Sequence, residues 1–220
     1  MFRYAVVGTI CLLTGGASAQ SPSVAMAAPR PVTAMEEPMP GDFWTYDVRD
    51  EISGTVTTRN NVVTEVTAAE ISVRYSIVGK ETSGLNVYDR SWNIKSGSPW
   101  KYRPHDGSGI KSPLKTGANW SFSGENINGD TGIIWKQTGQ CKVVGQETIT
   151  TKAGTFDTFK IDTVVIRHPI NDPTRKVEIT QQTWYVPTVD HWVKRTLMIR
   201  NDNHLVRSDT VELVEYGRKK

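Results

Sequence analysis

The side chains best suited to catalysis or metal binding in this sequence are its four histidines, His105, His168, His191 and His204. No two of them stand two or four residues apart, the spacings at which one strand or one helix would present a pair of zinc ligands. His105 precedes an aspartate and His191 follows one, but adjacent side chains of a strand point to opposite faces. The spacing therefore predicts surface or turn histidines and no metal site.

Two further segments begin like ion-binding loops and then depart from that pattern. Asn126, Asn128 and Asp130 place oxygen atoms at alternate positions, as a calcium loop does, but the sixth position is not glycine and the twelfth is not glutamate. Gly107 and Gly109 lie near a lysine, but the Gly-Lys step and the leading apolar strand of a phosphate loop are missing. We expect a glycine-containing hairpin loop at the first segment and no phosphate site at the second.

No arrangement of residues stands out as a catalytic centre. The Gly-x-Ser-x-Gly motif of serine hydrolases is absent, and the serines, histidines and aspartates allow no preferred triad. Many pairs of carboxylates could serve glycoside chemistry, and none can be selected over the others. The sequence therefore predicts neither catalytic residues nor a cofactor.

The seven tryptophans are Trp44, Trp92, Trp100, Trp120, Trp135, Trp184 and Trp192. One interpretation is an aromatic platform or groove for an apolar ligand or a sugar. The other is a core without disulfides that is filled by large rings, each burying about 150–250 Å², and we favour it for most of them. Trp100 and Trp120 lie near turns rich in glycine and proline, so they are the first candidates for ligand contact.

These residues must be positioned by β-strands, because apolar and polar side chains alternate along several segments. Residues 71–77 and 159–163 alternate in this way, and a later segment carries Val193, Leu197 and Ile199 on one face. Ser-Gly, Asp-Gly and Asn-Gly turn signals separate the runs, and helical patterns are nearly absent.

The pattern predicts an all-β fold with few or no helices, formed by residues 41–217 as a single domain. We expect a curved antiparallel sheet of about ten strands that forms an open barrel or a sandwich, since a sheet of that size seldom stays flat.

The N-terminus has the three regions of a signal peptide. Arg3 is followed by an apolar run over residues 5–13 and then by small residues that end in Ala-Ser-Ala. The run is shorter than the about 20 residues that a membrane-spanning helix needs. We predict a signal peptide over residues 1–19, cleavage after Ala19, a periplasmic or secreted mature protein, and no membrane span once the signal is removed.

Cys11 lies inside the predicted signal peptide, which leaves Cys141 as the only cysteine of the mature chain. Ile10 is too large for the position before a lipid-modified cysteine, so we do not interpret Cys11 as a lipoprotein anchor. A single cysteine cannot form an intramolecular disulfide, and a packed core must stabilise the domain instead. We expect Cys141 to be a small buried hydrophobe rather than a reactive thiol.

Composition also predicts the two flanking segments. Five prolines over residues 20–40 indicate an extended linker, and residues 218–220 form a short basic tail that we expect to be solvated coil. The formal net charge is only +3 and the basic residues are otherwise scattered, so nucleic acid is not an expected partner.

Two short motifs stand in the C-terminal half, namely Ala153-Gly154-Thr155-Phe156 and Trp184-Tyr185-x-Pro187 followed by Trp192-Val193-Lys194. Together they resemble the "AGTF" turn and the "WYxP…WVK" strand pair of a group of bacterial exported proteins of unknown function. The resemblance covers residues 140–200 and implies a fold like the open β-barrel of lipoprotein-localisation carriers. It implies structural roles for Gly154, Phe156, Trp184, Tyr185, Pro187 and Trp192, and no catalytic residue.

The motifs also make physical sense on their own. Gly154 permits a tight turn, Phe156 can pack beneath it, and Pro187 ends a strand where no amide donor is needed. Such proteins often carry glycine before the final strand, where this chain has Asp190. Aspartate tolerates a left-handed backbone better than most residues, so we expect the turn to be kept.

Three functions remain open from the sequence. The leading hypothesis is a periplasmic or cell-envelope protein that binds a hydrophobic or lipid-like ligand in the concave face of its sheet. The alternative is a non-enzymatic interaction or structural module with a filled core, which contacts an envelope protein through its linker and strand edges. The third is an uncharacterised hydrolase. The sequence predicts no oligomeric state.

Overall fold

The computed structural model describes residue 35 and residues 37–218, which form twelve β-strands and one short 3-10 helix. The strands are β1 (Asp42–Asp50), β2 (Val56–Val66), β3 (Glu70–Ile77), β4 (Ser83–Asp89), β5 (Ile94–Gly97), β6 (Trp100–Arg103), β7 (Asn119–Asn128), β8 (Ile134–Thr151), β9 (Gly154–Pro169), β10 (Val177–Val186), β11 (His191–Asn201) and β12 (His204–Arg218). The helix, η1 (Pro187–Val189), joins β10 to β11. The all-β prediction is therefore confirmed.

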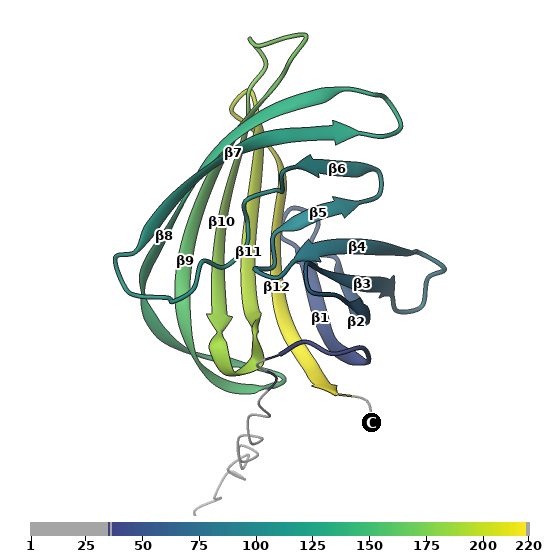
Figure 1. The fold of residues 1–220 in the computed structure, drawn as a ribbon, viewed down its shortest axis with the longest axis vertical. Helices are drawn as coiled ribbons and strands as arrows, with labels where there is room; N and C mark the ends of the chain where they lie inside the picture. Colours follow the sequence, from purple (N-terminus) through teal and green to yellow (C-terminus); the bar gives the residue numbers. More distant parts are fainter. Residues whose placement is uncertain (1–34, 36, 219–220) are drawn as a thin grey trace, which may run out of the picture.

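The strands form one antiparallel meander that closes on itself. Each strand pairs with the next in sequence, and β12 returns to pair with β1, so that the sheet is a closed barrel (Figure 1). The sequence predicted a smaller number of strands and did not predict the closure. The barrel is closed by the long β1–β12 pairing, which runs from Asp42↔Arg218 to Asp50↔Asp209.

Alternation of side chains fixes the inner and outer faces of this sheet. In β8, for example, Gln137, Gly139, Cys141 and Val143 are buried and the residues between them are exposed. The β8–β9 hairpin then turns tightly, because Thr151 pairs with Gly154. Gly154 adopts a φ of 144°, which favours glycine, so its predicted turn role agrees with its backbone.

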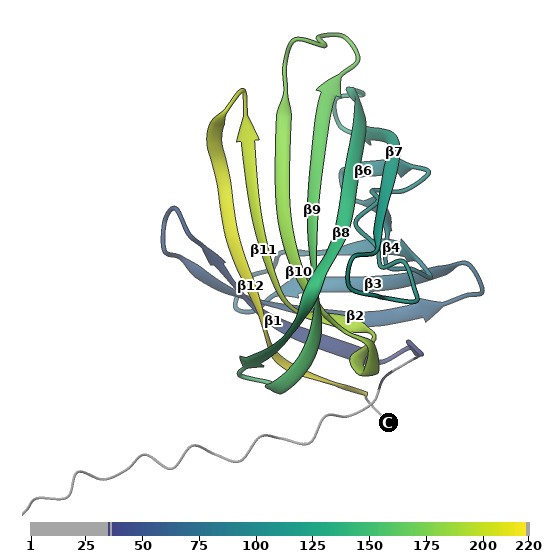
Figure 2. The same ribbon diagram turned by 90° about the vertical axis from the view of Figure 1, so that its left-hand side faces the viewer.

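The barrel has a tall wall and a short wall. Figure 2 shows β7–β12 standing nearly upright as a curved sheet, while β1–β4 run across its lower part. The ring is weakest between β5 and β6, which pair only through Ser96↔Lys101 and Gly97↔Trp100. The inside of the barrel is therefore bounded by long strands on one side and by short strands on the other.

The main hydrophobic core joins the ends of β1, β9, β11 and β12. Trp44, Phe156, Val193 and Leu213 are all at most 2 % exposed within it. Met35 also packs into this core at 1 % exposure, and its backbone N–H donates to the Thr188 carbonyl at 2.7 Å. Contacts of the folded domain therefore begin before residue 41, inside the segment that the sequence predicted as linker.

The C-terminal strand is longer than the sequence predicted. Arg218 is the last residue of β12 rather than part of a solvated tail, because the β1–β12 register places it opposite Asp42. Its guanidinium group donates to Asp42 at 2.7 Å and 2.9 Å and to the Glu37 carbonyl at 2.7 Å. This ion pair links β1 and β12 at one end of the strand pairing that closes the barrel.

A second, smaller cluster surrounds the cysteine. Cys141 is 2 % exposed and packs with Ile110, Val143, Ile161 and Tyr185. Burial raises the pKa of its thiol to about 11. The prediction of a small buried hydrophobe is confirmed.

Some predictions lie outside the described residues. They are the signal peptide over residues 1–19, cleavage after Ala19, the position of Cys11, most of the linker over residues 20–40, and the last two residues of the basic tail. Within the described part of the chain, no helix is long and apolar enough to cross a membrane.

Candidate functional site: the barrel lumen

A hollow of about 200 Å³ lies inside the barrel. Side chains from β1–β5 and from β10–β12 line it, and strands from opposite sides of the ring can share one hollow only in the interior. Its apolar and aromatic lining consists of Tyr46, Val48, Val73, Tyr88, Ile94, Trp192, Leu197 and Val211. Its polar lining consists of Arg59, Asn61, Asn86, Gln181, His191, Arg195, Arg207 and Asp209.

The charges in this hollow do not balance. Three arginines, Arg59, Arg195 and Arg207, face one aspartate, Asp209. Arg207 pairs with Asp209 at 2.5 Å, which leaves two positive charges over. Within the described residues, neither Arg59 nor Arg195 forms an ion pair with a carboxylate.

Neighbouring side chains hold both unpaired arginines in place. The Nε–H of Arg195 donates to Thr183 Oγ1 at 3.2 Å, and its guanidinium group lies 3.8 Å from the ring centroid of Trp192. The Nε–H of Arg59 donates to Asn61 Oδ1 at 2.9 Å, and its guanidinium group lies 4.5 Å from the ring centroid of Tyr75. Burial lowers the pKa of Arg195, and the positive charge of Arg59 adds to that effect.

A further buried carboxyl group, that of Asp106, accepts hydrogen bonds from its own neighbours. Asp106 accepts hydrogen bonds from the backbone N–H of Ile94 at 2.7 Å, from the backbone N–H of Ser108 at 3.2 Å and from the Ser108 hydroxyl. Burial raises the pKa of this carboxyl group above its usual 3.8. The charge of Asp106 raises the pKa of Arg195, although Asp106 forms no ion pair with it among the described residues.

His191 is buried, and the prediction that all four histidines lie on the surface or in turns is wrong for this residue. It is 4 % exposed. The centroid of its ring lies 4.3 Å from the ring centroid of Trp44, 4.7 Å from that of Trp92 and 3.7 Å from that of Trp192. Burial lowers its pKa well below 6.5, and the charges of Arg195 and Arg59 lower it further. The imidazole is therefore neutral at pH 7.

The phenols of the hollow are also neutral. Burial raises the pKa of Tyr46 and of Tyr88 above the usual 10.0. The Tyr46 hydroxyl donates to the Trp192 carbonyl at 2.9 Å, and the Tyr88 hydroxyl accepts from Asn86 at 3.3 Å. The hollow thus combines an aromatic and aliphatic wall, neutral hydrogen-bonding groups and an excess of positive charge.

Another interior arginine belongs to a separate polar layer. Arg167 donates to Gln137 Oε1 at 3.2 Å, and Gln137 also accepts from Asn126 at 3.0 Å and donates to the Asp106 carbonyl at 3.0 Å. Asn126 is fully buried, although the sequence placed it at the start of a hairpin loop. That loop follows two residues later, since β7 ends at Asn128 and β8 begins at Ile134.

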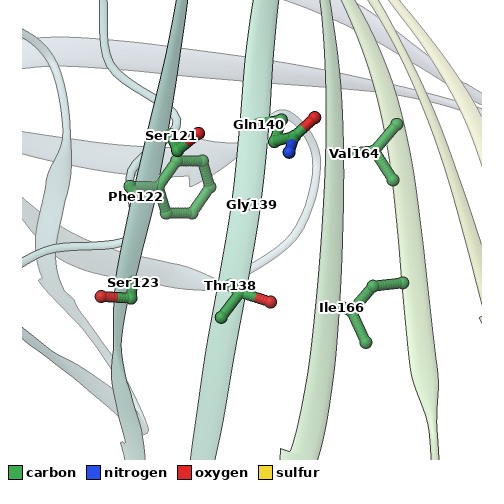
Figure 3. A pocket seen from close by; sticks show the side chains of 8 residues that line it. All are labelled: Ser121, Phe122, Ser123, Thr138, Gly139, Gln140, Val164 and Ile166. Carbon is green, nitrogen blue, oxygen red and sulfur yellow. The ribbon is translucent and has the colours of Figure 1, made fainter.

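A larger hollow of about 520 Å³ lies on the outer face of β7, β8 and β9 (Figure 3). It is bordered by exposed Ser121, Ser123, Thr138, Gln140 and Val164 and carries no charged group. This outer hollow offers little beyond an exposed strand surface, so we place the candidate site in the lumen despite its smaller volume.

The two tryptophans predicted to contact a ligand do not meet. Trp120 lies in β7 opposite Cys141 and lines a hollow of about 220 Å³ together with His105, Lys111 and Phe122. Trp100 lies in β6 opposite Asn128, which is eight residues, or about 26 Å, along β7 from Trp120. The two rings cannot hold one small ligand, and their individual roles stay predictions.

The residues of the two C-terminal motifs form contacts of a structural kind. Phe156 is 2 % exposed, and its ring centroid lies 5.9 Å from that of Tyr216. Trp184 donates to Glu147 at 2.8 Å, and Trp192 covers Arg195. Pro187 is the first residue of η1, directly after β10 ends.

The turn before β11 is kept, as the sequence predicted. Asp190 adopts a left-handed conformation with φ 49° and ψ 34°. Its carboxylate accepts from the Tyr185 hydroxyl at 2.5 Å and from Trp92 Nε1 at 3.0 Å. Burial raises its pKa to about 6.

Sequence reasoning missed Arg59 and Arg195 as site residues, although a signal was present. Arg195 stands midway between Val193 and Leu197, so the period of two places it on their apolar face. Arg59 likewise stands an even number of residues from Val63, which is 1 % exposed. No group of three or more metal-binding side chains occurs among the residues that the structure covers.

Comparison with known proteins gives similarity of fold alone. No family model matches the chain, and no curated protein matches its sequence. A crystal structure described as "a putative lipoprotein from Parabacteroides distasonis" has a TM-score of 0.52 and 13% identity, over 85% of this chain and 100% of that one. Another, described as "a putative exported protein with YmcC-like fold" from Bacteroides fragilis, has a TM-score of 0.51 and 14% identity, also over 85% of this chain and 100% of that one. The chain therefore shares its barrel fold with these two proteins.

Proposed function

We propose that this chain is an exported cell-envelope protein whose barrel lumen binds a small amphipathic ligand. The observation that carries the proposal is the hollow of about 200 Å³, walled by Val73, Leu197 and Trp192 on the apolar side and by arginines on the polar side. Ligand sites in proteins are typically concave, mostly apolar and equipped with a few placed polar groups. The lumen has this character.

The volume limits what can enter. An apolar cavity of about 150 Å³ is large enough for benzene, and sites for drug-sized ligands start at about 300 Å³. A hollow of about 200 Å³ therefore suits one ring or a short chain. This narrows the lipid-like ligand expected from the sequence to a small amphiphile, or to one end of a larger molecule.

Two observations support export. The first is the signal-peptide pattern of residues 1–19. The second is the fold, because the two similar structures are described as an exported protein and a lipoprotein. A binding role fits better than an enzymatic one, since the imidazole and the two phenols of the lumen are neutral and its aspartate is paired with Arg207.

The proposal can be tested with a neutral fluorescent probe. 4-(Dimethylamino)benzonitrile, a neutral molecule with one ring, should gain fluorescence in the purified protein, and hexan-1-ol should displace it. Leu197→Trp fills the lumen and should abolish the gain. Met198→Trp is the matched control, because Met198 is the next residue of β11 and is 39 % exposed.

The alternative function, an interaction module that contacts an envelope protein, is favoured by the outer hollow over β7–β9. Val164 is 45 % exposed there and lies beside Ile166 (Figure 3). A protein that binds no probe in its lumen, but loses a crosslinked envelope partner in a Val164→Asp variant, would support this alternative over lumenal binding.

A further inference from the structure

We propose that Arg59 and Arg195 form a two-arginine clamp for the anionic head of the lumenal ligand. This inference rests on the proposed binding function and names the chemical class of the ligand. The class is a carboxylate or a phosphate monoester that carries a short apolar or aromatic body.

The two arginines are built alike, although they come from distant strands. In each, the Nε–H donates to a side-chain oxygen, Asn61 for Arg59 and Thr183 for Arg195. In each, one face of the guanidinium group lies against an aromatic ring. Within the described residues, the structure gives neither one a hydrogen bond from its terminal nitrogens.

This construction prepares both groups to receive an anion. The hydrogen bond donated by Nε and the contact with the aromatic ring fix the plane of each guanidinium group. The terminal N–H donors point away from those contacts. A fixed guanidinium group can bind a carboxylate or a phosphate through two parallel hydrogen bonds, which are among the stronger ones in proteins. Less conformational entropy is lost on binding when the donors are already in place.

The charges of the lumen favour a partner of this kind. Arg207 is neutralised by Asp209, and the Asp106 carboxylate is occupied by Ile94 and Ser108. Among the described residues, Arg59 and Arg195 therefore have no carboxylate at ion-pair distance, and the more distant charge of Asp106 offsets part of the charge of Arg195. An anion is the ligand whose binding removes that imbalance, whereas a neutral or cationic ligand leaves it in place.

The strand register lets both arginines reach one head group. Arg59 in β2 lies opposite Tyr46 in β1, and Arg195 in β11 lies opposite Val211 in β12. Through Val48 in β1, the residue of β2 in line with Val211 is Thr57, two residues from Arg59. Three ladder spacings separate β2 from β11, or about 14 Å around the wall, and both arginine side chains line the same hollow. The apolar body of the ligand would then lie against Val73 and Leu197.

Three ligands with the same six-carbon body test the clamp. Hexanoate, hexyl phosphate and hexan-1-ol are each titrated against the purified protein in competition with the one-ring probe 4-(dimethylamino)benzonitrile. We expect at least one of the two anions to bind about ten to one hundred times more tightly than the alcohol, since each charge-assisted hydrogen bond is worth more than a neutral one. The ratio between the two anions identifies the head group.

Variants assign the preference to the two side chains. Arg59→Met and Arg195→Met should each lose most of the preference for the anion and keep the affinity for hexan-1-ol, while Arg195→Lys should keep part of it. Arg74→Met is the control, because Arg74 is an exposed arginine of β3. Thermal unfolding of each variant verifies that it is folded.

Equal affinities for the alcohol and both anions would overturn the clamp and leave lumenal binding in place. An anion preference that survives in both methionine variants, or that Arg74→Met removes equally, would also overturn it. Failure of the neutral probe and of all three ligands to bind would overturn the proposed function together with the clamp.

Discussion

Replacing Asp190 by Asn should remove a pH dependence from the stability of the barrel. Asp190 and Trp92 both have a left-handed backbone, with φ 49° and 63°. The Asp190 carboxylate accepts hydrogen bonds from the indole N–H of Trp92 and from the Tyr185 hydroxyl. Burial raises its pKa from 3.8 to about 6. Asparagine also tolerates the left-handed backbone, so the substitution removes the charge and keeps the turn.

The sign follows from proton binding. Between pH 4 and pH 6 the native state holds a proton on Asp190 that the unfolded chain releases, so the stabilising effect is complete below pH 4 and is lost as the pH rises through 6. A shift of about two units corresponds to about 3 kcal/mol, and partial exposure of Asp190 reduces the expected loss to about 2 kcal/mol.

The measurement is urea unfolding of the wild type and of Asp190→Asn at several pH values from 4 to 8. The difference in unfolding free energy should change by about 2 kcal/mol in favour of the variant across this range. At pH 4 the variant should be less stable by about 1 kcal/mol, because one of the two donors loses its acceptor. Asp130→Asn, in the exposed β7–β8 loop, is the control. A difference that stays constant with pH would refute the reasoning.

Two further predictions concern packing in and beside the smaller cluster around Cys141. Gly139→Ala should lower the unfolding free energy by about 1–3 kcal/mol, because a Cβ there would lie 2.2 Å from the Phe122 ring, which Gly107 confines on another side. Phe122→Ala should remove most of this penalty in the double variant, and Gly145→Ala, whose Cβ would meet nothing within 4 Å, should cost far less; equal costs for the two glycines would contradict the packing account. Cys141, with its burial and raised pKa, should react with a thiol reagent only at the rate of unfolding, and rapid labelling of the native protein would contradict its burial.

Local patterns in the sequence were sufficient to predict the strands but not the ring. Alternation along residues 71–77 and turn signals between runs identify an antiparallel sheet. Closure depends on pairing Asp42 with Arg218 across almost the whole domain, and no local signal carries that register. The same long-range contact explains why Arg218 is ordered in β12 rather than part of a tail.

The candidate site was harder to predict because it breaks the rule that predicted the strands. Arg195 stands on the apolar face of its strand, and a search for alternating apolar residues does not identify an arginine at such a position. The burial of His191 depends on Trp44 and Trp92, which approach it from distant parts of the chain. Trp120 was predicted to lie near a ligand and does line a hollow, although not the lumen.

The most direct test of lumenal binding is a crystal structure of the protein soaked with 4-bromobenzoate, in which anomalous scattering locates the bromine. We expect one bromine peak inside the barrel near Val73 and Leu197, with the carboxylate between Arg59 and Arg195. A bromine bound only in the outer hollow over β7–β9, or a lumen that stays without bromine at saturating ligand, would contradict it.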